Sequence, residues 1–318
     1  MRVAVLGGGS VGSVLSFLVS PGAEVVVYEA DPARRERLRS EGLVLRGALD
    51  GTVEVELGEA GKPVEPFDLM LIAVPAQYTA DALRKVSPFV HRDTRYISAQ
   101  DGFAISELEG LVGAPRSAAL TLWLSAGLSE DGSVEVEELR EAALLVGEGF
   151  DPDAADTFTG TLSKYVKVRV LEGAEAQAEF ARRTAVSSVL NSLCAVANRC
   201  PALLREDEGA RSMAERACRE AIEALGIEGD DVDPFRDGVW DRLMPPMSIH
   251  LARHGKTEVE YLSGEILRKG REKGMRLPVQ RSLYTVVKEM EAGRVAAGEK
   301  AFRELFRRVE EDEGLGLI

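Results

Sequence analysis

The stretch MRVAVLGGGSVG at residues 1–12, followed by EVVVYE at residues 24–29, decides the fold. The short apolar runs at residues 3–6 and 24–28 are rich in β-branched side chains and predict two buried strands. Small and apolar residues at helical spacing over residues 10–19 predict a helix between them. A strand, a helix and a second strand form the repeating unit of a parallel sheet, because parallel strands need a crossover connection.

The glycines between the first strand and the helix fit the pattern G-x-G-x-x-G. Gly7 permits a tight turn, Gly9 lets the backbone approach a pyrophosphate, and Gly12 lets the helix pack closely on the strand. The amide groups at the start of the helix supply an anion site. An acid, Glu29, ends the second strand about 20 residues later, where a carboxylate contacts the adenosine ribose. We therefore predict that a dinucleotide is bound by Gly7, Gly8, Gly9, Ser10, Val11, Gly12 and Glu29.

Glu29 also bears on which dinucleotide is bound. A carboxylate at this position accepts hydrogen bonds from the ribose 2′-hydroxyl of NAD and repels a 2′-phosphate, so Glu29 favours NAD. An alternative follows from Arg34, Arg35, Arg37 and Arg39. One or two of these guanidinium groups could turn toward the 2′-phosphate of NADP, although a run of charges on a helix is usually a solvated face.

The rest of the chain predicts two domains. A second unit begins at Asp68 with a continuously apolar strand, and the Asp50-Gly51 dipeptide predicts a hairpin turn in what we interpret as an insertion at residues 43–57. Alternating apolar residues between 134 and 170 predict edge strands that close the first domain. Residues 1–170 are thus expected to form a dinucleotide-binding, Rossmann-type domain with a doubly wound, mostly parallel sheet, and residues 171–318 an all-helical domain. Its helices are predicted over residues 174–197, 207–225, 257–273, 279–290 and 300–310.

Composition excludes several classes of protein. The 318 residues are 45% hydrophobic and 29% charged, which is enough for two folded domains and argues against disorder. The net charge of -14 makes nucleic acid an unfavourable partner, and no apolar run approaches the length of a membrane span. Three cysteines without a close pair are typical of reduced thiols in the cytoplasm, and no metal site is predicted.

The chain resembles the 2-dehydropantoate 2-reductase (ketopantoate reductase) family over nearly its whole length. The resemblance rests on the glycine pattern, the hairpin, the strand after Asp68, the Gln100-Asp101-Gly102 turn, and Lys256-Thr257-Glu258 close to a helix with Gly264. It implies reduction of ketopantoate to pantoate, a 2-oxo acid to a 2-hydroxy acid, in a cleft between a Rossmann domain and a helical domain like the C-terminal domain of 6-phosphogluconate dehydrogenase. It also implies NADP, whereas Glu29 favours NAD.

The reactive positions depart from the pattern of the family. Where the family has Lys-x-x-x-Asn-x-x-x-Asn, with the lysine as general acid, this sequence has Arg183, Ser187 and Asn191. A shift of one residue would bring Arg182 to the first position, but the gap-free match favours Arg183. Spacing of four places the three side chains on one helix face. Arginine can bind a substrate carboxylate or a developing alkoxide, but its pKa is too high for efficient proton donation.

Other positions are carried over from the resemblance. The cofactor lysine of the family is Pro75 here, and its Asn-Gly is Asp101-Gly102, so Pro75 and Asp101 are predicted at the cofactor. Glu258 is retained and is expected to face the cofactor and the reacting atoms. Ser187, Asn191 and Ser263, the last at a position where the family often has asparagine, are expected to contact the substrate together with Arg183.

His250 stands where the family has a carboxylate, and imidazole is well suited to exchange protons near neutral pH. It is therefore a candidate for the missing acid beside Arg183 and Glu258. Two other functions remain open: a dehydrogenase of the same fold acting on another 2-oxo acid or an opine-like substrate, and a non-catalytic dinucleotide-binding protein. The helix after Ala292 is an addition to the family pattern, and its apolar face is expected to pack on its own core, with a homodimer as the alternative.

Overall fold

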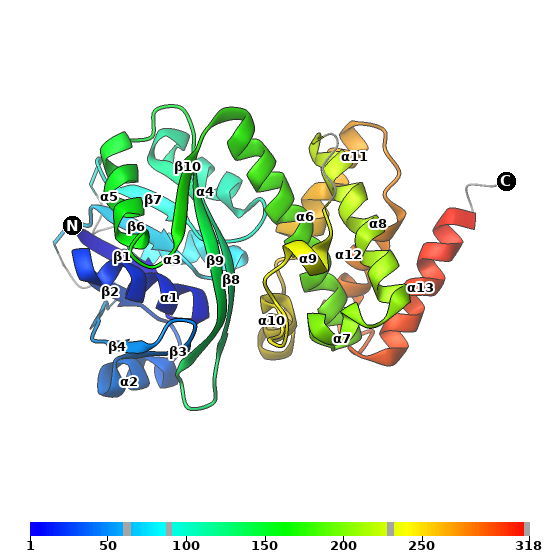
Figure 1. Ribbon diagram of the computed structural model, residues 1–318, viewed down its shortest axis with the longest axis horizontal. Coiled ribbons are helices and arrows are strands. Elements are labelled where there is room, and N and C mark those ends of the chain that lie inside the picture. The colour runs from blue at the N-terminus through cyan, green and yellow to red at the C-terminus, as the bar shows by residue number, and fades with distance from the viewer. Residues whose placement is uncertain (60–64, 87–90, 228–231, 315–318) are drawn as a thin grey trace. The chain divides into compact units, whose positions relative to one another are not determined.

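The computed structural model describes residues 1–59, 65–86, 91–227 and 232–314, and Figure 1 shows the order of their elements. The chain forms two compact units. The first comprises Met1–Gln100 and Ala104–Gln177, and the second comprises Asp101–Phe103 and Ala178–Ile318. The sequence placed the boundary at residue 170, whereas the units divide inside α6 (Gly173–Ala197), and a short segment from the first half of the chain belongs to the second unit.

The first unit is built on one sheet that starts from the predicted strand, helix and strand. β1 (Arg2–Leu6) pairs in parallel with β2 (Glu24–Tyr28), and α1 (Ser10–Val19) connects them. In the described residues the strand order is β4-β3-β9-β8-β7-β6-β1-β2-β5, with β10 beside β9. The remaining strands are β3 (Leu43–Gly47), β4 (Gly51–Val53), β5 (Glu56–Leu57), β6 (Leu69–Ile72), β7 (Arg95–Ser98), β8 (Ser117–Leu128), β9 (Val134–Val146) and β10 (Lys167–Leu171).

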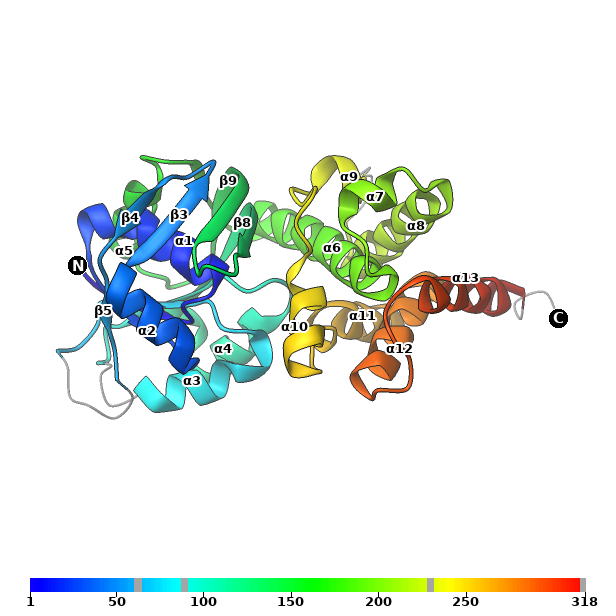
Figure 2. The same ribbon diagram turned by 90° about the horizontal axis from the view of Figure 1, so that it is seen from below.

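Helices cover both faces of this sheet. Val3 and Val5 belong to a core that includes residues of α1 and of α5 (Pro152–Leu162), while Ala4 and Leu6 belong to a core on the opposite face. That second core includes residues of α3 (Thr79–Val86) and α4 (Ala104–Val112), and Figure 2 shows these helices on the side away from α1 and α5. Successive side chains of a strand point to opposite faces, so β1 is buried twice, as its continuous apolar sequence predicts. The doubly wound parallel sheet is confirmed.

Two details of the first domain differ from the prediction. The Asp50-Gly51 turn is present, since β3 and β4 pair antiparallel, but the hairpin is part of the main sheet because β3 also pairs with β9. The prediction that β9 is an edge strand is wrong, because it lies between β8 and β3. Its length explains the difference: one end of β9 pairs with β3 and the other end pairs with β10.

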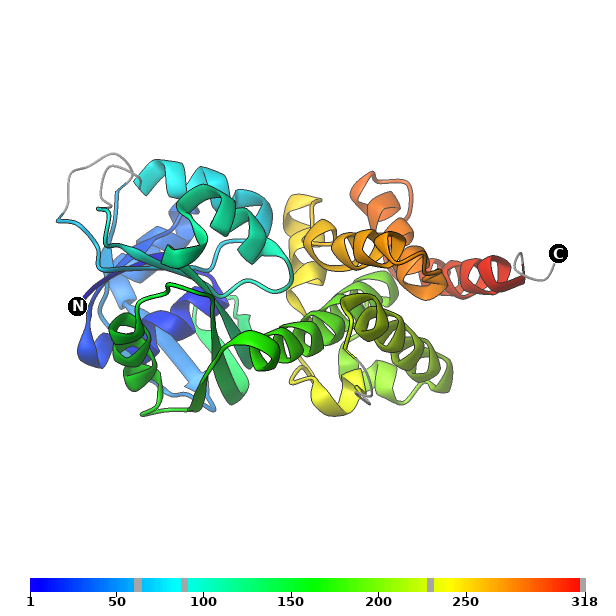
Figure 3. The same cartoon turned by 90° about the horizontal axis from the view of Figure 1, so that it is seen from above.

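The regular secondary structure of the second unit is all helical in the residues that the structure describes. α6, green in Figure 3, is one continuous helix of 25 residues. The predicted helix over residues 257–273 is a π-helix (Glu260–Gly264) that continues as α11 (Glu265–Glu272). The other helices are α7 (Pro201–Arg205), α8 (Glu208–Leu225), α9 (Pro234–Asp237), α10 (Pro246–His254), α12 (Pro278–Glu291) and α13 (Glu299–Gly314). None of the helices in the described part of the chain is long and apolar enough to span a membrane.

The additional C-terminal helix packs on the core of its own unit, as expected. Phe302, Leu305 and Val309 lie on one face of α13 and are buried, and α13 packs against α12. The ring of Phe306 lies 5.0 Å from that of Phe302, measured between ring centroids. The apolar face of α13 is therefore already covered within one chain.

We expect Leu305→Ala to lower the free energy of unfolding by about 2 to 5 kcal/mol, because Leu305 is fully buried and the surrounding helices cannot close the cavity completely. Urea denaturation followed by circular dichroism measures the effect. Leu203→Ala, at a leucine that is 56% exposed on α7, is the matched control and should change the stability by under about 0.5 kcal/mol. Equal effects of the two substitutions would contradict the packing of α13.

Candidate functional site

The glycine loop has the close packing that its sequence predicts. Gly7 has a φ of +105° and donates its amide hydrogen to the carbonyl oxygen of Tyr28 at 2.8 Å, which ties the loop to the end of β2. A Cβ atom at Gly12 would overlap the Gly7 carbonyl group, so only glycine lets α1 start this close to β1. A Cβ atom at Gly9 would meet nothing within 4 Å. The packing of the protein therefore leaves the side of Gly9 open, where a pyrophosphate would approach.

The first turn of α1 is available to an anion. Gly9 is the N-cap residue of α1 and offers no side-chain acceptor, and the first turn carries no acidic residue. Other helices begin differently, since aspartate side chains accept hydrogen bonds from the first amides of α2 (Pro32–Glu41), α5 and α8. The free amides of a helix start carry a partial positive charge and bind phosphate. The residues of the loop thus fit the pyrophosphate of a dinucleotide.

Glu29 lies directly at this loop. Its Oε2 accepts the amide hydrogen of Gly8 at 2.8 Å, and its Oε1 accepts that of Asp31 at 2.8 Å. These two bonds hold the carboxylate at the carboxyl end of β2, the edge where parallel sheets bind nucleotides. Each carboxylate oxygen has a further acceptor position, so the group can also accept the hydroxyl groups of a ribose.

A run of arginines on a helix is usually exposed to solvent, but Arg34 is buried. It is only 6% exposed, and its Nε donates to the carbonyl oxygen of Gly8 at 2.9 Å, while Nη2 donates to Ser13 Oγ at 3.0 Å and Nη1 to the Gly132 carbonyl. Burial lowers the pKa of the Arg34 guanidinium, and the nearby Glu29 carboxylate opposes that shift. Glu29 and Arg34 therefore bind the two sides of the Gly8 backbone and fix the loop.

The other arginines of α2 also have partners inside the protein. Arg35 donates to backbone carbonyl groups of two loops and Arg37 to a third, so each guanidinium has a defined position in the structure. The partners are the carbonyl groups of Glu29 and Gly58 for Arg35, the carbonyl group of Glu130 for Arg37, and the Glu36 carboxylate for Arg39.

Pro75 follows β6 at the same carboxyl edge of the sheet as the glycine loop. A Cβ atom at Gly7 would lie 2.8 Å from the carbonyl oxygen of Ala73, which places the loop against the end of β6. Pro75 is the N-cap residue of a short 3-10 helix (Ala76–Tyr78) and accepts the Tyr78 amide hydrogen at 2.9 Å. Its contact with a cofactor stays a prediction.

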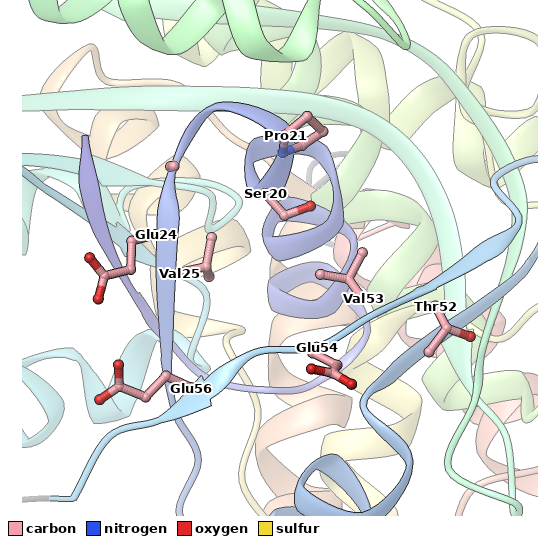
Figure 4. A pocket seen from close by; sticks show the side chains of 9 residues that line it. Ser20, Pro21, Glu24, Val25, Thr52, Val53, Glu54 and Glu56 are labelled. Carbon is pink, nitrogen blue, oxygen red and sulfur yellow. The ribbon is translucent and has the colours of Figure 1, made fainter.

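A separate pocket of about 460 Å³ lies at the opposite end of β2. Figure 4 shows the carboxylates of Glu24, Glu54 and Glu56 around it. Glu24 and Glu56 each form an ion pair with Arg2. The pocket is at the amino end of the strand, away from Gly7 and Glu29, so it is not the nucleotide site.

The second unit brings together the predicted polar residues of α6. Arg183 Nε lies 2.8 Å from Asp101 Oδ1, its Nη2 lies 3.2 Å from Oδ2, and Ser187 Oγ donates to the same Oδ2 at 2.9 Å. The guanidinium carbon of Arg183 lies 4.8 Å from the ring centroid of Trp240. The sequence marked Arg183 and Asp101 as two separate departures from the family, and the structure shows that they form one ion pair. Nothing in the sequence pattern identified Trp240 as its aromatic partner.

Asn191 connects α6 to α10. Its Oδ1 accepts the amide hydrogen of Met247 at 3.0 Å, and its Nδ2 donates to the Ser187 carbonyl oxygen at 2.9 Å. The side chain is 3% exposed, so in this structure it positions the start of α10. Its predicted contact with substrate stays a prediction.

The segment Asp101–Phe103 is held between α6 and the π-helix. Phe103 donates its amide hydrogen to the Tyr261 carbonyl oxygen at 2.8 Å, and its ring lies 5.1 Å from that of Phe180 on α6. Gly102 has a φ of +68°, and a Cβ atom there would overlap the Tyr261 carbonyl group, which explains the glycine. Ser263, on the π-helix, is fully buried, and its Oγ has no hydrogen-bond partner among the described residues. Single π-turns often occur at functional sites.

His250 and Glu258 form a pair. His250 Nδ1 lies 2.8 Å from Glu258 Oε2, and the two side chains are 21% and 16% exposed. The His250 and His254 ring centroids are 6.3 Å apart. Within the ranges that the structure describes, no group of three or more histidine, cysteine or acidic residues is arranged to hold a metal ion.

The residues after α10 are held by α12. Glu291 Oε1 accepts the amide and hydroxyl hydrogens of Thr257 at 2.8 and 2.7 Å, and Lys288 Nζ lies 2.6 Å from Glu291 Oε2. Burial alone would raise the pKa of Glu291, but the bonds from Lys288 and Thr257 outweigh it and lower that pKa. The sequence did not identify Glu291, because an acid near the end of a helix is usually solvated. In the structure, Glu291 holds Thr257, the residue next to Glu258.

The fold and the glycine loop define an oxidoreductase that uses NAD(P), and comparison with known proteins gives the family. The model for ketopantoate reductase PanE/ApbA matches residues 3–149, and the model for its C-terminal domain matches residues 175–291. The chain belongs to the ketopantoate reductase family. The resemblance inferred from the motifs is confirmed.

Similar proteins are distant in sequence and cover most of the chain. The 2-dehydropantoate 2-reductase of Aquifex aeolicus is 23% identical over 92% of this chain and 97% of its own, and that of Pyrococcus abyssi is 24% identical over 92% and 98%. A ketopantoate reductase structure from Ralstonia eutropha JMP134 has a TM-score of 0.77 at 23% identity and covers 92% of this chain and 99% of its own. A D-mandelate dehydrogenase structure with NADH and anilino(oxo)acetate has a TM-score of 0.79 at 19% identity, with the same coverage.

We expect Gly9→Val to abolish dinucleotide binding and to leave the fold intact, because the added side chain enters open space that the pyrophosphate needs. Fluorescence titration with NADH and NADPH measures binding, and thermal denaturation monitors the fold. Gly12→Val is the contrasting variant, since its side chain would overlap the Gly7 carbonyl group and should destabilise the domain itself. Undiminished binding by Gly9→Val would place the nucleotide elsewhere.

The lowered pKa of Glu291 makes its contribution to stability dependent on pH. A carboxyl group with a lowered pKa in the folded state stabilises the protein above its unfolded pKa, and this stabilisation is lost as the pH falls through the folded pKa. The difference in Tm between the wild type and Glu291→Gln should therefore be largest near neutral pH and shrink below its ordinary pKa of 4.5. Glu310→Gln, at an exposed position on α13, should show a small difference with little dependence on pH. A Tm difference between the wild type and Glu291→Gln that stays constant with pH would contradict the lowered pKa of Glu291.

Proposed function

We propose that this protein reduces a 2-oxo acid to a 2-hydroxy acid with a reduced nicotinamide dinucleotide, and that ketopantoate is the first substrate to test. Membership of the ketopantoate reductase family, with both domain models matched, is the observation that carries the proposal. The glycine loop supports it, because the open side of Gly9 and the uncapped start of α1 fit a pyrophosphate. The bound dinucleotide would supply the hydride.

The first unit would bind the dinucleotide and favour NADH over NADPH. The Glu29 carboxylate stands at the ribose position and would repel a 2′-phosphate. The nearby arginines of α2 already have other partners: Arg34 donates to the carbonyl oxygen of Gly8, and Arg35 donates to those of Glu29 and Gly58. Binding a 2′-phosphate would require a guanidinium to leave those partners.

The second unit would bind the acid. Arg183 keeps its positive charge at any working pH and has the planar geometry that suits a carboxylate or a developing alkoxide. Asp101 and the Trp240 ring fix its orientation, and Asp101 offsets part of its charge. The substrate carboxylate would therefore meet a guanidinium group whose orientation is fixed and whose charge is partly neutralised. The geometry of the hydrogen bonds would then contribute more to substrate binding than charge attraction alone. Ser187, Asn191 and Ser263 are proposed to complete the contacts to the acid.

The first test is the initial rate of NADH and of NADPH oxidation with ketopantoate as substrate. We expect turnover with both, and a higher kcat/KM with NADH because of Glu29. Glu29→Gln should reduce this preference, because it removes the charge that repels the 2′-phosphate. Absence of turnover with ketopantoate and with a panel of other 2-oxo acids would refute the proposal, and a preference for NADPH would refute the role of Glu29.

The proposed role of Arg183 predicts a change in KM. We expect the double variant Asp101→Asn/Arg183→Gln to raise KM for the 2-oxo acid by about 10- to 100-fold. This is the effect of losing one hydrogen bond to a charged group. Both partners are replaced, so no unpaired buried charge remains. The dissociation constant for NADH, measured in parallel, separates a loss of substrate binding from a loss of the cofactor contact predicted for Asp101. An unchanged KM would remove Arg183 from the substrate site.

A further inference from the structure

Reduction of a carbonyl group requires a proton for the new hydroxyl oxygen, and Arg183 is a poor source of it. A guanidinium group does not release its proton near neutral pH. Two of its nitrogens also already donate to Asp101. The residue that stands at the lysine position of the family can therefore bind the substrate, and another group must supply the proton. This step rests on the proposed function.

His250 has the chemistry and the surroundings of a proton donor. Its Nδ1 faces Glu258 at 2.8 Å, and a carboxylate on one ring nitrogen fixes the tautomer and stabilises the imidazolium. Its Nε2 makes no hydrogen bond to a residue that the structure describes, so this nitrogen remains available to a substrate. The side chain is 21% exposed, which allows solvent to return the proton after each turnover.

Residues close to each member of the pair are held by bonds from other helices. Asn191 on α6 accepts the Met247 amide hydrogen, and His250 lies three residues later on α10, on the same side as the buried Met247. Glu258 follows Thr257, whose amide and hydroxyl groups bind Glu291 on α12. α6 carries Arg183 two turns before Asn191, so the helix that holds the start of α10 also presents the proposed substrate ligand.

We propose that His250, positioned by Glu258, donates the proton in the reduction. A hydride supplied by the reduced dinucleotide, which becomes oxidised, would add to the carbonyl carbon. The C=O π electrons then move to oxygen, and the Nε2–H bond of the imidazolium breaks to form the O–H bond. His250 is left as neutral imidazole with its Nδ1 hydrogen bonded to Glu258, and a proton from solvent restores the imidazolium. Glu258 thus acts as a positioning residue for His250.

The proposal fixes the sign of the pH dependence. Glu258 faces the His250 ring from the segment after α10, and His254 lies one turn along the same helix. From α6, the contacts to α10 come from Asn191 and Ser192, which carry no charge. Reduction needs the imidazolium, so kcat should fall as the pH rises and the ring loses its proton. The reverse reaction needs the neutral ring and should show the opposite trend.

The test compares His250→Asn and Glu258→Gln with His254→Asn as the matched control on the same helix. We expect His250→Asn to lower kcat by about 10²- to 10⁴-fold and to remove the decline of kcat at high pH. Glu258→Gln should move that decline to lower pH, since the imidazolium loses its counter-charge. A merely structural role of Glu258 would change the amount of folded protein and leave the profile in place. His254→Asn should keep both kcat and the pH profile.

A binding measurement separates this proposal from the proposed function. Calorimetric titration of the NADH complex with oxamate, in buffers of different ionisation enthalpy, counts the protons taken up on binding. In the pH range where kcat of the wild type has declined, we expect the wild type to take up a proton on binding oxamate and His250→Asn to take up none, with NADH affinity equal in both. Turnover by His250→Asn within about threefold of wild type, with the same pH profile, would overturn the role of His250 alone. Absence of both turnover and oxamate binding in the wild type would overturn both proposals.

Discussion

The close approach of α1 to the end of β1 is the constraint on which the rest of the first unit depends. Gly12 lets the helix start against the Gly7 carbonyl group, and a helix that starts there presents its first amides at the glycine loop. Glu29 and Arg34 then bind opposite sides of the Gly8 backbone, so the loop is held by charged groups on both sides. An anion meets a loop whose shape is already set, and little conformational entropy is lost on binding.

Two positions of the second unit that differ from the family pattern form a single interaction. Arg183 and Asp101 each depart from the residues expected by resemblance, and together they form a two-point ion pair beside Ser187. Arg183 is buried, and a buried arginine without a carboxylate would be costly, because its desolvation would not be offset. The two positions are therefore coupled: a change at one alters the energetic effect of the other. In the proposed mechanism, Arg183 binds the charge of the substrate and His250 exchanges the proton, so two different residues carry these roles.

Much of the fold follows from local sequence, and much of the site does not. The apolar run of β1, the glycine pattern and the helical spacing of residues 174–197 act over short distances, so the sequence predicts β1, α1 and α6 closely. The position of β9 in the middle of the sheet depends on pairing between distant strands, which no local pattern contains. The same is true of the site: Arg183 was predicted from the family resemblance, and spacing of four placed it on one helix face with Ser187 and Asn191. Its contacts with Asp101 and Trp240 join residues far apart in sequence.

The assignment of Asp101–Phe103 to the helical unit has a consequence for how the chain is made. The ribosome synthesises this tripeptide long before α6 and the π-helix that hold it. The parallel sheet can therefore begin to assemble while the tripeptide is still solvated, and the Asp101 carboxylate gains its arginine only after the second half emerges. A cut at Gln177 would likewise yield a first fragment with an unpaired acid and a second fragment with an unneutralised cation. The helical unit is therefore completed by three residues from the first half of the chain.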